Sequence, residues 1–103
     1  MKVGIKNQIK KTVSSDLTAK AMGSGRLDVF ATPAMVAMME EAAHTLVEAE
    51  LEEGQGTVGT SMTVSHLAAT PVGMEVTCES ELIEVDGRKL VFEIKAMDEA
   101  GLI

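Results

Sequence analysis

Residues 32–51 read TPAMVAMMEEAAHTLVEAEL, and they predict the longest helix of the chain. Thr32 can cap this helix with its hydroxyl, and a proline at the first helical position gives up no hydrogen bond. The helix should run to about Leu51 and end before Gly54. Its first half is apolar on every side until Glu40 interrupts it, so we expect this half to be surrounded by the rest of the protein.

Strand patterns lie on both sides of this helix in the sequence. The apolar residues of 3–13 share one parity, with lysines at most of the other positions, which predicts a half-buried strand. Three further alternating patterns cover residues 58–66, 74–82 and 90–96. Each has one apolar and one polar face, as an antiparallel sheet packed against a single helix requires. The order of these elements indicates an α+β fold, and the order alone is compatible with more than one such fold.

The last two strands should form a hairpin, and parity predicts its register. A three-residue loop of Val85, Asp86 and Gly87, with Gly87 left-handed, would pair Leu82 with Leu90. A two-residue turn of Asp86 and Gly87 would instead put the two apolar sets on opposite faces of the sheet. We therefore expect the three-residue loop.

Length and composition limit the class of protein. The 103 residues give room for one domain, residues 1–103, and 46% hydrophobic with 24% charged residues is typical of a globular chain. No apolar run reaches the length of about 18 residues that a membrane-spanning helix needs, and the N-terminus lacks the apolar run of a signal peptide. A net charge of −7 with only two aromatic residues argues against a nucleic-acid partner. We expect a cytoplasmic protein with neither a membrane nor a nucleic acid as partner.

Neither a metal nor another cofactor is expected. One cysteine, two histidines and scattered carboxylates offer no ligand spacing that is typical of a metal site. The single cysteine also excludes an internal disulfide.

Three residues are candidates for chemistry, and each has a structural alternative. A buried carboxylate at Glu40 must be paired, protonated or retained for function, and His44, four residues on, is a possible ion-pair partner. His66 ends the apolar face of its predicted strand, where a histidine is more often a core residue. Thr32 needs no explanation beyond its place as a helix cap.

Three segments of the chain carry a resemblance to a known family. They are VFATPAMVAMMEEAA at 29–43, EGQGTVGTSMTVSHLAATPVGMEV at 53–76 and VDGRKLVFEIKAMDEAG at 85–101. In this order and spacing they resemble the fluoroacetyl-CoA thioesterase-like branch of hot-dog proteins. The resemblance implies a hot-dog fold, in which an antiparallel sheet wraps around one long central helix. It is weak before residue 29, and the chain stops at Ile103, before the final strand that is usual in the family.

The resemblance also assigns roles to the candidate residues. Its catalytic threonine at the helix start, its glutamate eight residues on and its histidine before AATP fall on Thr32, Glu40 and His66. Gly59 matches a glycine whose backbone faces the thioester, and we expect Gly59 and Thr60 to bind substrate. A thioester needs a nucleophile, a base and donors for the oxyanion. The sequence leaves open whether Thr32, Glu40 or water is the nucleophile.

The resemblance implies an acyl-CoA thioesterase, which hydrolyses a small acyl-CoA thioester to the free acid and coenzyme A. The expected partners are the acyl-CoA substrate and further copies of the chain, in a homodimer or a tetramer with the site between subunits. A non-catalytic acyl-CoA or acyl-carrier binding module and a purely structural dimer are the alternatives. A hot-dog hydratase is disfavoured because the Asp/His spacing of that class is missing. Residues 14–28 match the family poorly, so specificity for fluoroacetate is not carried over.

Overall fold

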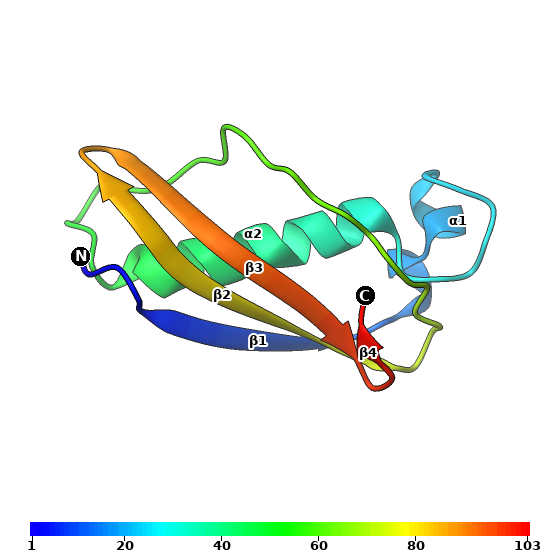
Figure 1. Cartoon of the computed structure of the whole chain (residues 1–103). Coiled ribbons are helices and arrows are strands. Elements are labelled where there is room, and N and C mark those ends of the chain that lie inside the picture. The colour runs from blue at the N-terminus through cyan, green and yellow to red at the C-terminus, as the bar shows by residue number, and fades with distance from the viewer.

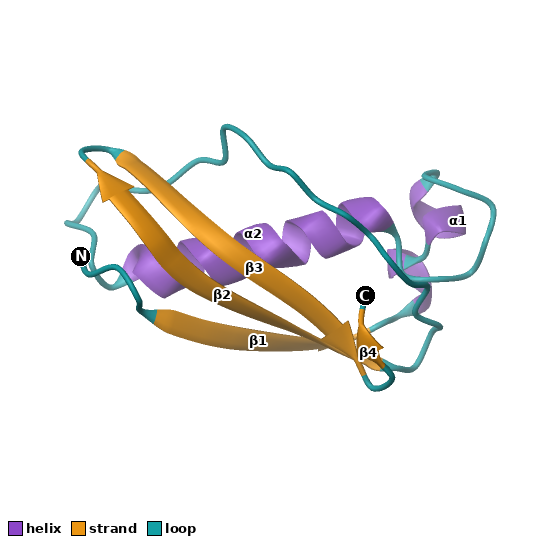
Figure 2. Cartoon of the chain, viewed as in Figure 1, coloured by secondary structure: helices purple, strands orange, loops and turns teal.

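A curved antiparallel sheet lies against one long helix in the computed structural model, which describes residues 1–103 (Figure 1). The strands follow one another across the sheet in chain order: β1 (Lys6–Thr12), β2 (Glu75–Asp86), β3 (Lys89–Asp98) and β4 (Gly101–Leu102). The helical elements are η1 (Ser15–Leu17), α1 (Ala19–Met22) and the long helix α2 (Thr32–Glu48). Figure 2 shows α1 beside the N-terminal end of α2. The predicted α+β arrangement of one long helix and an antiparallel sheet is confirmed.

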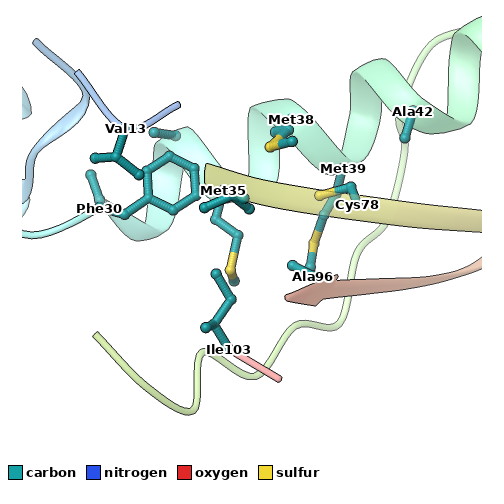
Figure 3. Packing of buried hydrophobic residues seen from close by; sticks show 12 residues of the cluster. Val13, Phe30, Met35, Met38, Met39, Ala42, Cys78, Ala96 and Ile103 are labelled. Carbon is teal, nitrogen blue, oxygen red and sulfur yellow. The ribbon is translucent and has the colours of Figure 1, made fainter. Parts of the chain in front are cut away.

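The hydrophobic core lies between α2 and the inner face of the sheet (Figure 3). On β2 the side chains of Val76, Cys78 and Leu82 are buried, as the parity of residues 74–82 predicts. Helix α2 contributes one stripe of buried side chains at helical spacing: Ala34, Met35, Met38, Met39 and Ala42. Burial of this stripe holds α2 against the sheet and thereby determines where the N-terminus of the helix lies.

The outer face of the sheet is polar. Lys6 lies opposite Glu81 on the neighbouring strand, with 3.8 Å between Nζ and Oε1, and Lys10 Nζ lies 3.9 Å from Glu75 Oε1. Exposed ion pairs of this kind add little stability, so they mark a solvated face. One apolar and one polar face is the arrangement that the alternating patterns predict.

The N-terminus of α2 differs from the prediction. Ala31 is the N-cap and makes no side-chain capping bond, so Thr32 is the first helical residue and not the cap. The Thr32 hydroxyl is therefore free for a partner outside the helix. The expectation that the apolar half of α2 is surrounded is wrong for one chain, because the sheet covers one side of the helix and leaves Ala37 and Glu40 exposed.

The C-terminus of α2 comes earlier than the predicted end near Leu51. The helix ends at Glu48, and the N–H group of Leu51 donates to the Glu48 carbonyl three residues back. The chain thus leaves α2 through a tighter turn than an α-helix has. Neither α2, at 17 residues, nor any other helix has the length and apolar character needed to cross a membrane.

The hairpin of β2 and β3 forms, but its predicted register is wrong. Its two-residue turn starts at Gly87, and Leu82 pairs with Phe92 instead of Leu90. A bulge between Leu82 and Glu84 adds one residue to β2, which restores the parity that a two-residue turn would otherwise break. Gly87 has a φ of 60°, so its predicted left-handed conformation is confirmed.

Residues 57–66, which we call the extended segment, belong to no sheet, so the strand predicted over 58–66 is wrong for one chain. The segment makes no backbone hydrogen bond. Alternation predicts an extended backbone with two different faces, whereas a strand also needs a neighbour to bond with, and the chain provides none here. In Figure 1 the segment forms part of the long green connection that leads from α2 to β2.

Candidate active site

The start of α2 and the end of the extended segment meet at one point. Thr32 Oγ1 lies 2.7 Å from His66 Nδ1, a hydrogen bond between residues 34 positions apart in the sequence. Thr32 is exposed and His66 is half-buried, so the pair lies at the surface of the chain. When the hydroxyl donates and Nδ1 accepts, the imidazole is placed to take the hydroxyl proton.

A backbone contact beside this pair helps to bring the two residues together. The N–H group of Phe30 donates to the Thr70 carbonyl at 2.8 Å. Phe30 lies two residues before Thr32, and Thr70 lies four residues after His66. This hydrogen bond therefore holds the segment before Thr32 beside the segment after His66.

One ring nitrogen of His66 has no partner. Nε2 is buried and makes no hydrogen bond in the chain. When Nδ1 accepts from Thr32, Nε2 carries the ring proton and needs an acceptor. A buried donor left without an acceptor costs about 1–3 kcal/mol. The chain by itself supplies no group that removes this cost.

The N-terminus of α2 adds backbone donors beside the pair. The first hydrogen bond of the helix runs from Met35 N–H to the Ala31 carbonyl, so the N–H groups of Thr32 and Ala34 make no backbone hydrogen bond. Free N–H groups at the positive end of a helix stabilise negative charge. A hydroxyl, a base and donors for an oxyanion thus lie together, and these are the groups that acyl transfer requires.

Glu40 lies against Gly59, a residue of the extended segment. A Cβ added to Gly59 would come within 2.5 Å of Glu40 Oε2, so the backbone passes directly beside the carboxylate. Glu40 is exposed in the chain rather than buried, which corrects the expectation from its apolar neighbours. None of the ion pairs in the structure includes Glu40 or His44, so the alternative that these two residues pair is wrong.

The chain therefore holds the candidate residues as two separate pairs. The structure brings Thr32 to His66 and brings Glu40 to Gly59. Eight residues separate Thr32 from Glu40 on one helix, which corresponds to about 12 Å along its axis. One acyl group cannot contact both pairs of a single chain at that separation. Thr60, next to Gly59, has an exposed side chain.

Sequence reasoning gave no role to two polar residues near the site. Thr70 is fully buried, and its Oγ1 donates to Asp98 Oδ2 at 2.8 Å. This bond, with weaker help from two backbone N–H groups, lowers the pKa of the Asp98 carboxyl below its ordinary value. The turn residues after β3 indicate a loop at Asp98, but no local signal connects that loop to Thr70.

Neither a metal cluster nor an active thiol is found at the site. No group of three or more His, Cys, Asp or Glu side chains lies close enough together to hold a metal ion. Cys78 is buried in the core, and desolvation raises the pKa of its thiol to about 11. Since the thiolate is the reactive form, Cys78 is not a nucleophile of this site.

Several solved structures share this fold. A variant of the fluoroacetyl-CoA-specific thioesterase FlK, in complex with fluoroacetate and CoA, matches 100% of this chain and 87% of its own, with a TM-score of 0.95 and 35% identity. A thioesterase superfamily member from Thermus thermophilus gives a TM-score of 0.90 and 28% identity over 99% of this chain and 76% of its own. A hot-dog-like protein from Thermanaerovibrio acidaminovorans gives 0.88 and 29% over 98% and 75%. The chain thus has the hot-dog fold of the thioesterases, as predicted.

Sequence comparison gives the family within that class. The fluoroacetyl-CoA-specific thioesterase family matches residues 13–103, and the chain belongs to this family. The match includes residues 14–28, where the motifs alone gave a poor resemblance. The curated fluoroacetyl-CoA thioesterase of Streptantibioticus cattleyicolor is 45% identical over 71 residues, which is 69% of this chain. The aligned part is 51% of that relative, so the chain spans about half its length.

Proposed function

We propose that the chain hydrolyses a small acyl-CoA thioester to the free acid and coenzyme A. The observation that carries the proposal is the 2.7 Å hydrogen bond between Thr32 Oγ1 and His66 Nδ1 at the N-terminus of α2. Membership of a family named for fluoroacetyl-CoA thioesterase activity supports the same reaction.

In the proposed reaction His66 acts as the base. It takes the proton of the Thr32 hydroxyl, or of a water in its place, while the oxygen attacks the thioester carbonyl carbon. The carbonyl electron pair moves to oxygen, where the N–H groups of Thr32 and Ala34 stabilise it. When this electron pair re-forms the carbonyl, the C–S bond breaks, and protonated His66 gives its proton to the departing CoA thiolate. If the acyl group has moved to Thr32, water releases it with the same base.

Glu40 joins this site in the proposal through a second copy of the chain. Within one chain, Glu40 lies about 12 Å along the helix from Thr32, and His66 Nε2 has no acceptor. In a homodimer where Glu40 of one chain faces His66 of the other, the Glu40 carboxylate accepts a hydrogen bond from the Nε2–H group and orients the base. In this position it can also activate the water that attacks.

The extended segment supports such a dimer. Its backbone N–H and C=O groups make no hydrogen bond in the chain, and backbone groups of this kind are nearly always paired when they become buried. Val58 and Met62 on this segment are 85% and 41% exposed. Antiparallel pairing of the segment with its two-fold copy would bond these backbone groups and cover the side chains.

The register of this pairing follows from the position of the two candidate pairs. When the two-fold axis passes at Met62 or at Thr63, Gly59 of one chain lies within one residue of His66 of the other. Adjacent strands are about 5 Å apart, and Gly59 already touches Glu40. The same pairing therefore carries Glu40 of one chain to His66 of the other, and it does so twice in the dimer.

The proposal favours a dimer over a tetramer and places it in the cytoplasm. The outer sheet face carries exposed ion pairs such as Lys6 with Glu81 and few apolar side chains, so it is poorly suited to a second interface. Cys78 is free and unpaired, which fits a reducing compartment. Gly59 and Thr60 remain the proposed contacts for substrate, because Gly59 contacts Glu40 and the exposed Thr60 follows it in the proposed interface.

Release of CoA from a panel of acyl-CoA esters tests the proposal. The panel contains short, branched, aromatic and halogenated acyl groups, each with and without EDTA. We expect turnover of at least one small ester, no effect of EDTA, and a loss of about a hundredfold or more in Thr32→Val and His66→Ala. Binding of acyl-CoA without turnover would identify a non-catalytic module instead. Absence of both binding and turnover would leave a structural dimer.

A further inference from the structure

One carboxylate holds the residues that follow His66, and it has no part in the proposed chemistry. We propose that Asp98, acting through Thr70, positions the His66 imidazole for its hydrogen bond with Thr32. The inference rests on the proposed function for its kinetic test and on the Thr32–His66 hydrogen bond for its structural test.

Thr70 is the first link between Asp98 and the site. Its Oγ1 donates to Asp98 Oδ2 at 2.8 Å, and its carbonyl accepts the N–H group of Phe30 at 2.8 Å. Phe30 leads directly into Thr32, and Thr70 follows His66 by four residues. The Thr70 side chain has an exposed fraction of 0%, so water cannot replace its bond to the carboxylate.

The turn between β3 and β4 is the second link. Asp98 Oδ1 accepts two backbone N–H groups of this turn, at 2.8 Å and 3.2 Å. The turn leads through β4 to Ile103, whose carbonyl accepts the N–H groups of Leu67 and Ala68. The Asp98 carboxylate therefore holds the residues after His66 at both ends, through Ile103 on one side and Thr70 on the other.

These links matter because no other hydrogen bond within the chain fixes the backbone next to His66. The extended segment makes no backbone hydrogen bond, so the first anchors near the imidazole are at residues 67, 68 and 70. Hydrogen bonds to an ionised carboxylate are stronger than those between neutral groups, which suits Asp98 as the common anchor. A displacement of about 1 Å in a catalytic group can cost on the order of a hundredfold in rate. Asp98 makes no bond to Thr32 or His66, so its role is positioning.

The two histidines of the chain permit a test that does not depend on turnover. In ¹⁵N NMR spectra, His66 should show an acceptor Nδ1 and a protonated Nε2, while exposed His44 should show averaged tautomers. Thr70→Val keeps the shape of the side chain and removes its hydroxyl, so the His66 signals should move toward those of His44. Thr70→Ser should restore the wild-type signals. Unchanged His66 signals in Thr70→Val would overturn the inference.

Asp98→Asn covers the case in which Thr70→Val does not fold. The amide keeps the volume of the carboxylate but loses an acceptor and the charge, so a smaller shift of the His66 signals in the same direction is expected. Wild-type His66 signals in a folded Asp98→Asn protein would contradict a positioning role for Asp98.

A double-mutant cycle gives the kinetic test. Thr70→Val should lower kcat about ten- to a hundredfold and change KM by less than about twofold. In the His66→Ala background it should cause no further loss, because the group that it positions is gone. An equal loss in both backgrounds would show a general structural defect and overturn the positioning role.

Thr45→Val is the matched control for this cycle. The Thr45 hydroxyl donates to the Glu41 carbonyl within α2, away from the Thr32–His66 pair, so kcat should not change. If His66→Ala proves fully active, the proposed function fails. The NMR comparison then still decides whether Asp98 and Thr70 position the imidazole.

Discussion

Glu40 and Gly59 are in direct contact, since a Cβ at residue 59 would lie 2.5 Å from Glu40 Oε2. The contact joins the middle of α2 to the extended segment, which ends at His66. It keeps a carboxylate that is free of ion pairs beside a backbone that has no strand partner. The contact is therefore a sensitive place to test the proposed site.

Gly59→Ala should lower turnover without unfolding the chain. The new methyl group must displace the Glu40 carboxylate, which is the far end of a flexible side chain and moves at little cost in stability. We expect kcat to fall about tenfold or more and Tm to change by less than about 4 °C. Gly56→Ala is the matched control, because nothing lies within 4 Å of a Cβ at that position. Equal rates in the two variants would show that the contact of Glu40 with Gly59 has no part in the reaction.

Glu40→Gln should cut turnover about a hundredfold or more and leave stability unchanged. The amide keeps the shape of the side chain but cannot act as a base or a negative partner for His66. His44→Ala should be silent in both turnover and Tm, because His44 makes no ion pair with Glu40 in the structure. A small and equal loss of stability in the two variants, with no loss of rate, would contradict a catalytic role for Glu40.

Asp98→Asn should change how the stability of the fold depends on pH. The Thr70 hydroxyl, more than the backbone N–H groups, lowers the pKa of the native Asp98 carboxyl below its ordinary value of 3.8. Because the native pKa lies below the unfolded one, the charged form stabilises the fold above about pH 4, and this contribution is lost as pH falls through the native pKa. Urea unfolding from about pH 7 down to about pH 2 should show wild type more stable at neutral pH and the difference vanishing in acid. A difference that is independent of pH would mean that the charge contributes nothing.

Cys78 should not react with thiol reagents in the native protein. Burial, with a smaller contribution from the charge of Glu41, raises the pKa of this thiol from 9.0 to about 11. At about pH 8 the thiolate is therefore scarce as well as inaccessible. Titration with a chromogenic disulfide should detect no thiol in the folded chain and one thiol after denaturation. Rapid reaction of the folded chain would contradict the burial of Cys78 and would complicate any assay of released CoA.

The sequence predicted the elements that show their apolar face through their own periodicity and find its cover within one chain. Helix α2, strand β1 and the β2–β3 pair follow from periodicity because each buries its own apolar face. The strand at residues 58–66 failed because alternation cannot supply a neighbouring strand. The hairpin register failed because the predicted pattern ended at Leu82, directly before the bulge between Leu82 and Glu84 that shifts the parity of β2.

The candidate site was predictable only in part for a related reason. Spacing along α2 allowed Glu40 to pair with His44, yet the structure turns Glu40 toward Gly59, a residue distant in sequence. The link from Thr70 to Asp98 spans 28 residues and joins two polar side chains, which parity arguments do not detect. Long-range polar contacts of this kind require the fold before they can be found.

A mixture of two inactive variants tests whether the site is shared between chains. Glu40→Gln keeps Thr32 and His66 intact, and His66→Ala keeps Glu40 intact. If each site takes Glu40 from one chain and His66 from the other, a heterodimer holds one complete site and one doubly altered site. Random exchange makes about half of the dimers heterodimers, so refolding the two variants together should recover about a quarter of the wild-type rate of CoA release.

Mixing His66→Ala with Thr32→Val is the matched control, because the 2.7 Å bond places Thr32 and His66 in the same chain. Every site of that heterodimer lacks one of the two residues, so no activity should return. Native mass spectrometry must show heterodimers in both mixtures. Heterodimers without recovery in the first mixture would contradict a Glu40 contributed by the second chain. Recovery in the control would mean that Thr32 and His66 act from different chains, against the hydrogen bond that the structure shows.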